Sequence, residues 1–357
     1  MDKMTHTKFN LNNFLLALSE PLDNCILNNN RYKTQYSSKR VAFIALKIAT
    51  FNDFSKANLS DILSYAILDK HKLQKASLEI FPLNDLSILE NKTFQDIFSL
   101  AHMIEDMIRM EEGRIVNKKE ILENIEKLEF DEVIKENFFY LGDNYSFWFD
   151  LSDQYRLPFF ILDILEDETI EISYETLIVI SKIISDITYI YTNRRYETDI
   201  SFYLKPMCQF YNFDLKDTSR MIISGYLYTI GLCQIPQYIF QKEGTLSDKE
   251  YEIVASAPYH TKKILSLMYG FDDISKLASS YAEKIDGSGY PYHLEGNELG
   301  LKNRLFTILT LFQALIEKRV YREGFTKEEG LKELISLGER GSLDLSIVKD
   351  FQKILIS

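Results

Sequence analysis

The sequence predicts an all-α protein with two helical domains, and three observations support this. Apolar residues recur at helical spacing along most of the 357 residues. Gly and Pro, which interrupt helices, number only 14 and 7. No convincing series of alternating strand patterns is present. A chain of this length can also bury two separate cores, so we expect two domains rather than one.

Three apolar stripes mark predicted helices in chain order. They lie within residues 41–48, 177–191 and 305–316, where apolar side chains return every three or four positions. Such a stripe covers one side of a helix and leaves the other side polar. Each segment is therefore expected to pack one face against a core.

Two capping boxes predict where further helices begin. Ser247 is followed by Glu250, and Thr326 is followed by Glu329. A hydroxyl and a carboxylate at this spacing satisfy backbone amides that the first turn of a helix leaves without partners. We expect helices to start directly after Ser247 and Thr326.

The division between the domains is expected near residues 150–158. An aromatic cluster ends there and gives way to a polar stretch followed by Pro158. This pattern predicts one domain over residues 1–152 and a second over residues 153–357. The cluster comprises Tyr145, Phe147, Trp148 and Phe149.

Charge and cysteine content exclude several classes of function. The formal net charge of −12 opposes binding to nucleic acid, because a nucleic-acid binder must neutralise phosphates with Lys and Arg. The three cysteines have no metal-ligand spacing, which is typical of free thiols in a reducing compartment. No apolar run is long enough for a membrane span, and residues 1–13 lack a signal-peptide core. We therefore expect a cytoplasmic protein without nucleic-acid partners.

One Gly-rich loop carries the most specific motif in the chain. It reads Asp286, Gly287, Ser288, Gly289, Tyr290 and Pro291. Arg304 follows at the start of a predicted helix, and Arg319, Tyr321 and Arg322 follow that helix. This segment resembles the defining DGxGYP segment of the HD-GYP family. The resemblance implies a helical HD-GYP-like domain in the carboxy-terminal half.

The amino-terminal half resembles a second, more degenerate HD domain. Residues 36–49 are similar to the first helix of the family, and residues 63–73 to the helix that should end in a His-Asp pair. Ser37, Asp69 and Lys70 stand at the ligand positions of this half. The resemblance thus implies two tandem HD-type domains.

The family hydrolyses cyclic di-GMP at a metal centre, for which it needs His and Asp ligands. The resemblance places other side chains at these positions. They are Tyr228, Thr229, Ala257, Tyr281, Ala282 and Thr310. The first ligand should fall near residues 198–200, where no His is present. Neutral Tyr and Thr are poor substitutes for imidazole, and Ala has no lone pair. The sequence therefore predicts no metal site and no cofactor.

From these substitutions we expect a pseudoenzyme that is not catalytically active. Its function would be protein–protein interaction or scaffolding in a cyclic dinucleotide or taxis pathway, with a diguanylate cyclase-type protein as the candidate partner. Two alternatives stay open. The first is a receptor that binds cyclic di-GMP or another nucleotide without hydrolysis, and the second is a residual metal-dependent cyclic di-GMP phosphodiesterase.

The loop and the basic residues each have two interpretations. Residues 286–291 are either a tight turn, in which Gly287 and Gly289 take positive φ, or an exposed docking loop. Glu283 and Asp286 could ligate a metal, but a hydrogen-bonded turn is the stronger prediction for Asp286. The candidate ligand-binding cations are Lys284, Arg304, Arg319 and Arg322. Salt bridges to acidic surface groups are the competing interpretation for these cations.

Overall fold

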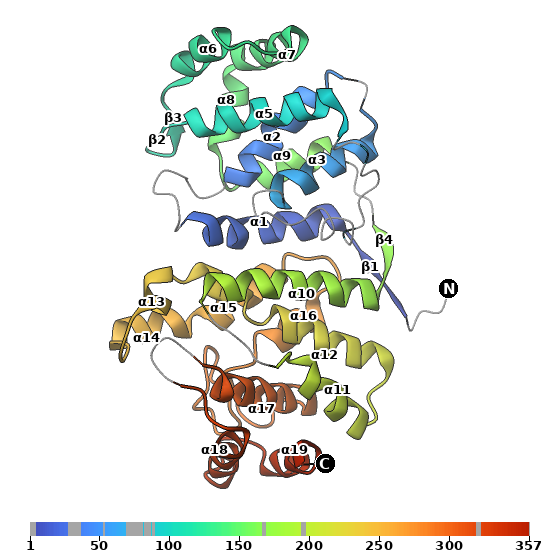
Figure 1. The fold of residues 1–357 in the computed structure, drawn as a ribbon, viewed down its shortest axis with the longest axis vertical. Coiled ribbons are helices and arrows are strands. Elements are labelled where there is room, and N and C mark those ends of the chain that lie inside the picture. Colours follow the sequence, from blue (N-terminus) through green and yellow to red (C-terminus); the bar gives the residue numbers. More distant parts are fainter. Residues whose placement is uncertain are drawn as a thin grey trace. The chain divides into compact units, whose positions relative to one another are not determined.

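The computed structural model describes residues 5–27, 37–52, 54–68, 81, 87, 90–165, 169–193, 198–318 and 323–356. Nearly all regular structure in these residues is helical, which confirms the all-α prediction (Figure 1). Strands are limited to two short antiparallel pairs in the described residues. No helix in the same part of the chain is both long and apolar enough to cross a membrane.

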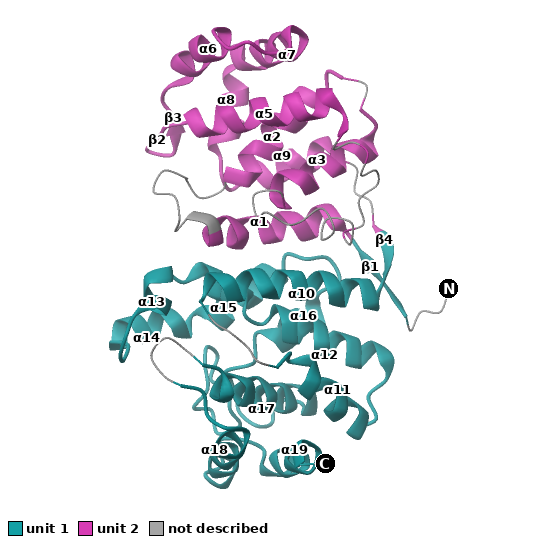
Figure 2. Ribbon diagram, in the orientation of Figure 1, with its two compact units in different colours: residues 1–9, 170–357 teal, residues 10–169 magenta. Residues whose placement is uncertain are grey.

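The chain forms two compact units (Figure 2). Residues 10–169 form unit 2, whereas unit 1 combines residues 1–9 with residues 170–357. The predicted division at 152/153 thus falls within unit 2. Pro158 lies in the first turn of a helix, where its missing N–H costs nothing, so it begins an element instead of ending a domain.

Unit 2 is built around helix α2 (Ser37–Ala49), which packs against helices on several sides. The other elements are α1 (Leu11–Leu27), α3 (Lys56–Leu68), α5 (Lys92–Met107), β2 (Met110–Glu111), β3 (Arg114–Ile115), α6 (Lys118–Glu126), α7 (Glu132–Asp143), α8 (Tyr145–Ser152) and α9 (Leu157–Ile164). The predicted stripe on α2 is completely buried. Phe43 stacks on Phe147 of α8 at 5.9 Å between ring centroids, and Phe147 and Trp148 of the aromatic cluster are buried in this core. The other two members, Tyr145 and Phe149, are exposed.

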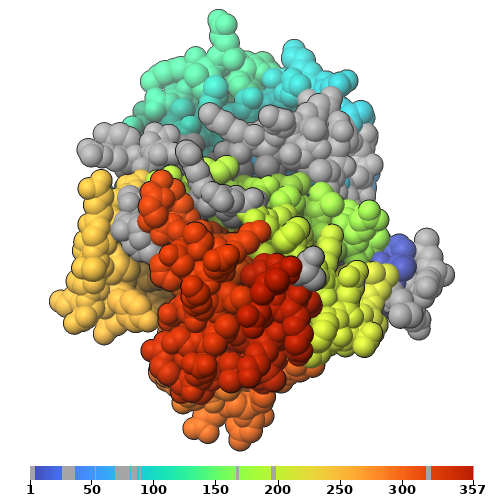
Figure 3. Space-filling model, turned by 60° about the horizontal axis from the view of Figure 1, so that its bottom comes forward, coloured from blue at the N-terminus to red at the C-terminus, as the bar shows by residue number. Residues whose placement is uncertain are grey.

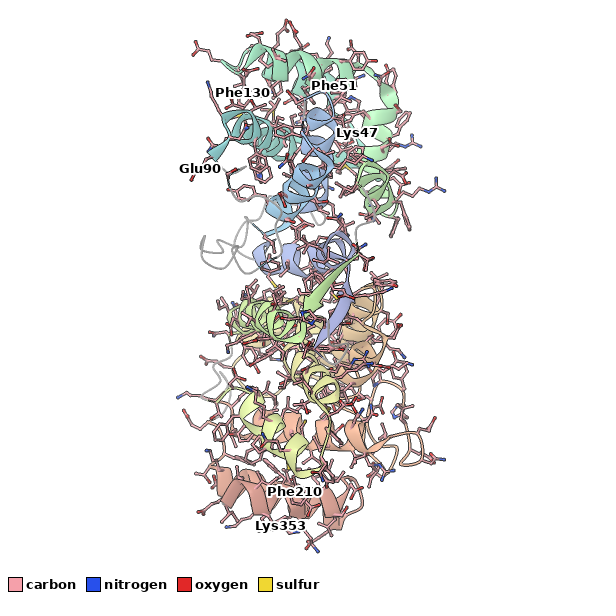
Figure 4. The ribbon with its side chains drawn as sticks, turned by 90° about the vertical axis from the view of Figure 1, so that its right-hand side faces the viewer. Lys47, Phe51, Glu90, Phe130, Phe210 and Lys353 are labelled. Atoms are coloured by element: carbon pink, nitrogen blue, oxygen red, sulfur yellow. The ribbon has the colours of Figure 1, made fainter. Side chains whose placement is uncertain are left out.

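A buried ion pair lies inside unit 2. The Nε and Nη2 atoms of Arg40 on α2 donate to the two carboxylate oxygens of Glu105 on α5, at 2.8 and 2.7 Å. Both side chains are almost completely buried. Two parallel hydrogen bonds satisfy charges that water cannot reach. Lys47 in the last turn of α2 and Phe51 just after the helix are labelled in Figure 4, and Phe51 meets the Tyr140 ring edge-on at 5.5 Å.

Unit 1 begins with a strand from the amino terminus. β1 (His6–Phe9) pairs antiparallel with β4 (Ile170–Ser173), with Phe9 opposite Ile170. The helices that follow are α10 (Tyr174–Tyr191), α11 (Ser201–Phe210), α12 (Leu215–Leu227), η3 (Ile230–Gln234), α13 (Gln237–Gln241), α14 (Asp248–Ala255), α15 (Ala257–Leu265), α16 (Asp272–Ala278), α17 (Leu301–Ile316), α18 (Lys327–Glu339) and α19 (Leu345–Ile356). Helix α12 lies at the centre of this unit, packed against α10, α11 and α16.

Both predicted capping boxes are present in unit 1. Ser247 and Glu250 begin α14, and Thr326 and Glu329 begin α18, with hydroxyl and carboxylate each bonded to the expected backbone amide. The carboxy-terminal residues cover the middle of the face shown in Figure 3. At that end, Phe210 and Lys353 are labelled in Figure 4, and Tyr211 donates to Asp350 at 2.9 Å to join α11 to α19.

Candidate functional site

The Gly-rich motif forms a tight turn within the loop that joins α16 to α17. One carboxylate oxygen of Asp286 accepts from the amide and the hydroxyl of Ser288, at 2.9 and 2.7 Å. The other oxygen accepts from the Ser342 hydroxyl at 2.6 Å. Burial raises the pKa of this carboxyl, but the hydrogen bonds from Ser342 and Ser288 outweigh it and lower the pKa to about 2. Asp286 is thus a charged residue that organises the turn.

The two glycines of the motif serve different purposes. Gly287 has a φ of +75°, as predicted for a tight turn. Gly289 does not take a positive φ, and that part of the prediction was wrong. Instead, a Cβ atom at Gly289 would lie 2.3 Å from the backbone nitrogen of Lys284. Gly289 is required because two backbone segments approach each other closely.

Glu283 supports the same loop from inside. Its carboxylate is fully buried and accepts from the amides of Tyr292 and Leu294, at 2.8 and 3.0 Å. Both oxygens are therefore directed at backbone of the loop. Together with Asp286, this geometry supports a structural role for the two carboxylates that could otherwise have ligated a metal.

Tyrosines surround this loop on the side of α14 and α15. The ring of Tyr290 meets that of Tyr251 edge-on at 6.3 Å. Tyr259 and Tyr292 are 49% and 40% exposed, and Lys262 places its ammonium 4.3 Å from the centroid of the Tyr292 ring. We call Tyr251, Tyr259, Tyr290 and Tyr292, with Lys262, the tyrosine face. It combines exposed aromatic rings with a positive charge.

Of the four predicted ligand-binding cations, only two fall in the described residues. Arg304 donates to the carbonyl of Leu299 at 2.7 Å, to the carbonyl of Gly296, and to the carboxylate of Asp344 at 3.1 Å. Its guanidinium is therefore used to hold the loop against α19. Lys284 is half-buried beside Asp286. Arg319 and Arg322 lie outside the described residues, as do Asp69 and Lys70 of the amino-terminal half.

The positions compared with metal ligands are occupied by packed side chains. The buried Tyr228 ring contacts the rings of Tyr281 and Phe306, at 5.0 and 6.2 Å between centroids. The Thr310 hydroxyl donates to the carbonyl of Phe306 in its own helix at 2.8 Å. Thr229 and Ala257 are buried and Ala282 is half-buried. No three His, Cys, Asp or Glu side chains in the described part of the chain gather as a metal site would require. These residues do not fit a metal ion.

One constellation in unit 1 escaped the sequence analysis. Asp199 lies in the segment where the resemblance placed the first ligand, and it joins two elements instead. It accepts from the Lys182 ammonium at 2.7 Å and from the Tyr226 hydroxyl at 2.8 Å. Burial raises the pKa of Asp199, but the hydrogen bonds from Lys182, Ser201 and Tyr226 lower it below its ordinary value. No local spacing signals this cluster, because its members are 17 and 27 residues apart.

A model of the family described as HD domain matches residues 179–347. Among curated proteins, the chain is 30% identical over 109 residues to 3'3'-cGAMP-specific phosphodiesterase 1 of Vibrio cholerae, covering 30% of this chain and 25% of that protein. It is 30% identical over 135 residues to a cyclic di-GMP phosphodiesterase of Vibrio cholerae, covering 36% and 27%. The chain thus spans about a quarter of the length of these relatives.

A solved structure resembles the whole chain. The structure of a cyclic GMP-AMP specific phosphodiesterase of Vibrio cholerae covers 98% of this chain and 98% of its own, with a TM-score of 0.57 and 15% identity. At that identity the likeness concerns the fold. It supports the all-α arrangement of both units.

These comparisons correct one expectation. The prediction that the chain is not an enzyme was wrong, because the curated relatives are named as phosphodiesterases. The prediction relied on six side chains and gave them more weight than the similarity of the domain around them. Those side chains show that this region is a poor fit for a metal ion. They do not show that the chain lacks enzymatic activity.

Proposed function

Because residues 179–347 are an HD domain with relatives of the HD-GYP phosphodiesterase type, we propose that this chain acts on a cyclic dinucleotide, with phosphodiester hydrolysis as its reaction. The observation that carries the proposal is the sequence similarity to phosphodiesterases. Some of these relatives are named for cyclic di-GMP and others for 3'3'-cGAMP. The intact turn of Asp286–Pro291, with both supporting carboxylates, agrees with it. The chain would accordingly belong to cyclic dinucleotide signalling.

The tyrosine face is the surface we assign to recognition of the nucleotide. A cyclic dinucleotide presents two flat bases and two anionic phosphodiesters. Exposed rings such as those of Tyr259 and Tyr292 can stack on a base, and Lys262 can attract a phosphate. The ammonium already lies over the Tyr292 ring, so charge and ring are presented together.

The described residues at the compared positions do not fit a metal. The residues of this chain contribute binding and positioning. Lys262 and Tyr292 would hold the nucleotide, while Glu283 fixes the backbone that carries Tyr292. Docking of a protein partner such as a diguanylate cyclase-type protein on residues 286–291 stays a prediction.

The proposal is tested by binding and turnover measured on the same purified chain. Cyclic di-GMP and 3'3'-cGAMP are titrated by calorimetry and then incubated with the chain alone, with Mn²⁺, or with Fe²⁺ under anaerobic conditions, and linear products are separated by chromatography. We expect binding of at least one nucleotide and accumulation of its linear product. Absence of binding to both would overturn the recognition surface, and binding without product would overturn the hydrolysis.

Two variants localise the site. Tyr292→Ala and Lys262→Ala should each weaken nucleotide binding about tenfold, because a stacked base or a paired phosphate contributes on the order of 1–3 kcal/mol. Tyr238→Ala is the matched control, as Tyr238 is an exposed tyrosine of α13 outside the tyrosine face. Equal losses in all three variants would contradict the assignment.

A further inference from the structure

Unit 2 contains a pocket that the proposed function does not use. It has a volume of about 350 Å³ and lies between the β2–β3 hairpin and the end of α8 with the turn that follows it. Pockets of a few hundred Å³ are the size that takes small organic ligands. Its lining includes Arg114 from the hairpin, and Phe149, Asp153, Gln154 and Tyr155 from the other side.

Two aromatic residues that line this pocket are exposed to solvent. Phe149 is 65% exposed and Tyr155 is 78% exposed, although both belong to a unit with a large buried core. Exposing large rings to water is unfavourable unless a partner covers them. Rings presented in this way at the wall of a pocket are suited to stacking on a flat ligand.

Arg114 adds a positive charge to this pocket. Its guanidinium makes no ion pair or hydrogen bond with any described residue. The hairpin that carries it is nevertheless firmly placed. Glu112 and Gly113 take φ values of +48° and +74°, as a two-residue hairpin turn requires, and the Ile115 amide donates to the Ser152 hydroxyl at 3.2 Å. The backbone of Arg114 is thus fixed, while its guanidinium is available to a ligand.

Hydrogen-bond acceptors complete the pocket. Asp153 accepts from the Arg156 amide with one oxygen at 3.1 Å, and its other oxygen accepts no hydrogen bond from the described residues. The Gln154 side chain likewise makes none there. The acidic Glu111 lies opposite Arg114 in the hairpin. A bare anion is therefore poorly matched, since acidic groups accompany the single Arg.

We propose that this pocket binds the guanine base of a nucleotide. Guanine offers two acceptors, O6 and N7, that match an Arg guanidinium, and N–H donors on its opposite edge that match a carboxylate. Adenine carries an amino donor where guanine has O6, so it would meet Arg114 with a donor. The flat base would be covered by Phe149 and Tyr155, and Asp153 would accept from the guanine edge.

The guanine could belong to a mononucleotide or to a cyclic dinucleotide, and binding of 5'-GMP and cyclic di-GMP to the full chain separates the two. Calorimetry should detect 5'-GMP, with 5'-AMP at least about tenfold weaker, because one good bidentate contact discriminates by about 1–3 kcal/mol. Tighter binding of cyclic di-GMP than of 5'-GMP, lost in Arg114→Ala, would identify the cyclic dinucleotide as the source. Binding of cyclic di-GMP that Arg114→Ala leaves intact, with 5'-GMP binding lost, would identify the mononucleotide.

Matched variants decide whether the pocket is responsible. Arg114→Ala and Phe149→Ala should each weaken 5'-GMP binding about tenfold or more. Phe159→Ala is the control, because Phe159 is also 65% exposed in unit 2 but does not line the pocket. Thermal unfolding of each variant checks that the fold persists.

Three results would overturn the proposal. They are no 5'-GMP binding at millimolar concentration, equal binding of 5'-GMP and 5'-AMP, and equal losses in Phe149→Ala and Phe159→Ala. Each of them can be told from a failure of the proposed function. The hydrolysis assay depends on unit 1, whereas every residue altered here belongs to unit 2.

Discussion

At the scale of single residues, three carboxylates in unit 1 stabilise the fold through hydrogen bonds. Glu283 and Asp286 accept hydrogen bonds from amides and hydroxyls in and beside their loop. Asp199 accepts hydrogen bonds from Lys182 and Tyr226. An acidic residue near a family motif is easily taken for a ligand. The hydrogen bonds decide otherwise, because an oxygen that accepts from the backbone has less capacity left for a cation.

The charge of Asp286 gives a pH-dependent contribution to stability. Its pKa is lowered from 3.8 to about 2 in the folded chain, so its stabilising effect is fully present above pH 4 and is lost as the pH falls towards 2. Asp286→Asn should therefore be less stable than the wild type at pH 5, with the difference shrinking at pH 2. Urea unfolding at several pH values measures this, and a constant difference over the range would contradict it.

At the scale of elements, the 22-residue connection between α16 and α17 is held from several sides. Arg304 stabilises it most directly, because its guanidinium donates to two carbonyls within the connection and to Asp344 before α19. The connection that contains the motif turn is therefore held in place by the hydrogen bonds of Arg304. This explains why a residue proposed to bind a ligand is fully occupied in the fold.

Removing the Arg304 side chain should make the α16–α17 connection more mobile while the helices stay folded. Arg304→Ala is expected to destabilise the chain by about 1–3 kcal/mol, the cost of leaving partly buried acceptors without their donor. It should also speed hydrogen exchange at residues 296–300. Arg340→Ala is the control, since Arg340 makes an exposed ion pair with Glu333. Similar exchange in both variants would show that Arg304 does not fasten the connection.

At the scale of the whole molecule, the sequence predicts the regular parts well. Stripes, capping boxes and the motif turn all depend on residues close together in the chain, and the structure contains each of them. The pocket of unit 2 could not be predicted, because it joins Arg114 to Phe149 across 35 residues. The same holds for Lys182 with Asp199 and Tyr226. Such sites depend on which helices meet, and periodicity does not specify that.

The core of unit 2 allows a test of how a buried charge contributes to the fold. Arg40→Ala should destabilise the unit by about 3–5 kcal/mol, because it removes two charged hydrogen bonds that the buried Glu105 carboxylate accepts. The double variant Arg40→Met with Glu105→Leu should recover most of the loss, since apolar side chains replace both charges of this pair. Chemical denaturation compares the three chains. A double variant as unstable as Arg40→Ala would contradict this account.

The β1–β4 pair has a consequence for the order in which the chain is made and for any attempt to shorten it. During translation, β1 emerges before unit 2, and its partner β4 follows only after all of unit 2 has been synthesised. Unit 1 can therefore complete its β1–β4 pair only after some 160 further residues have been synthesised. A fragment starting at residue 153 would retain β4 with an open edge. Expression of unit 1 by itself calls for residues 5–9 to be grafted ahead of residue 170.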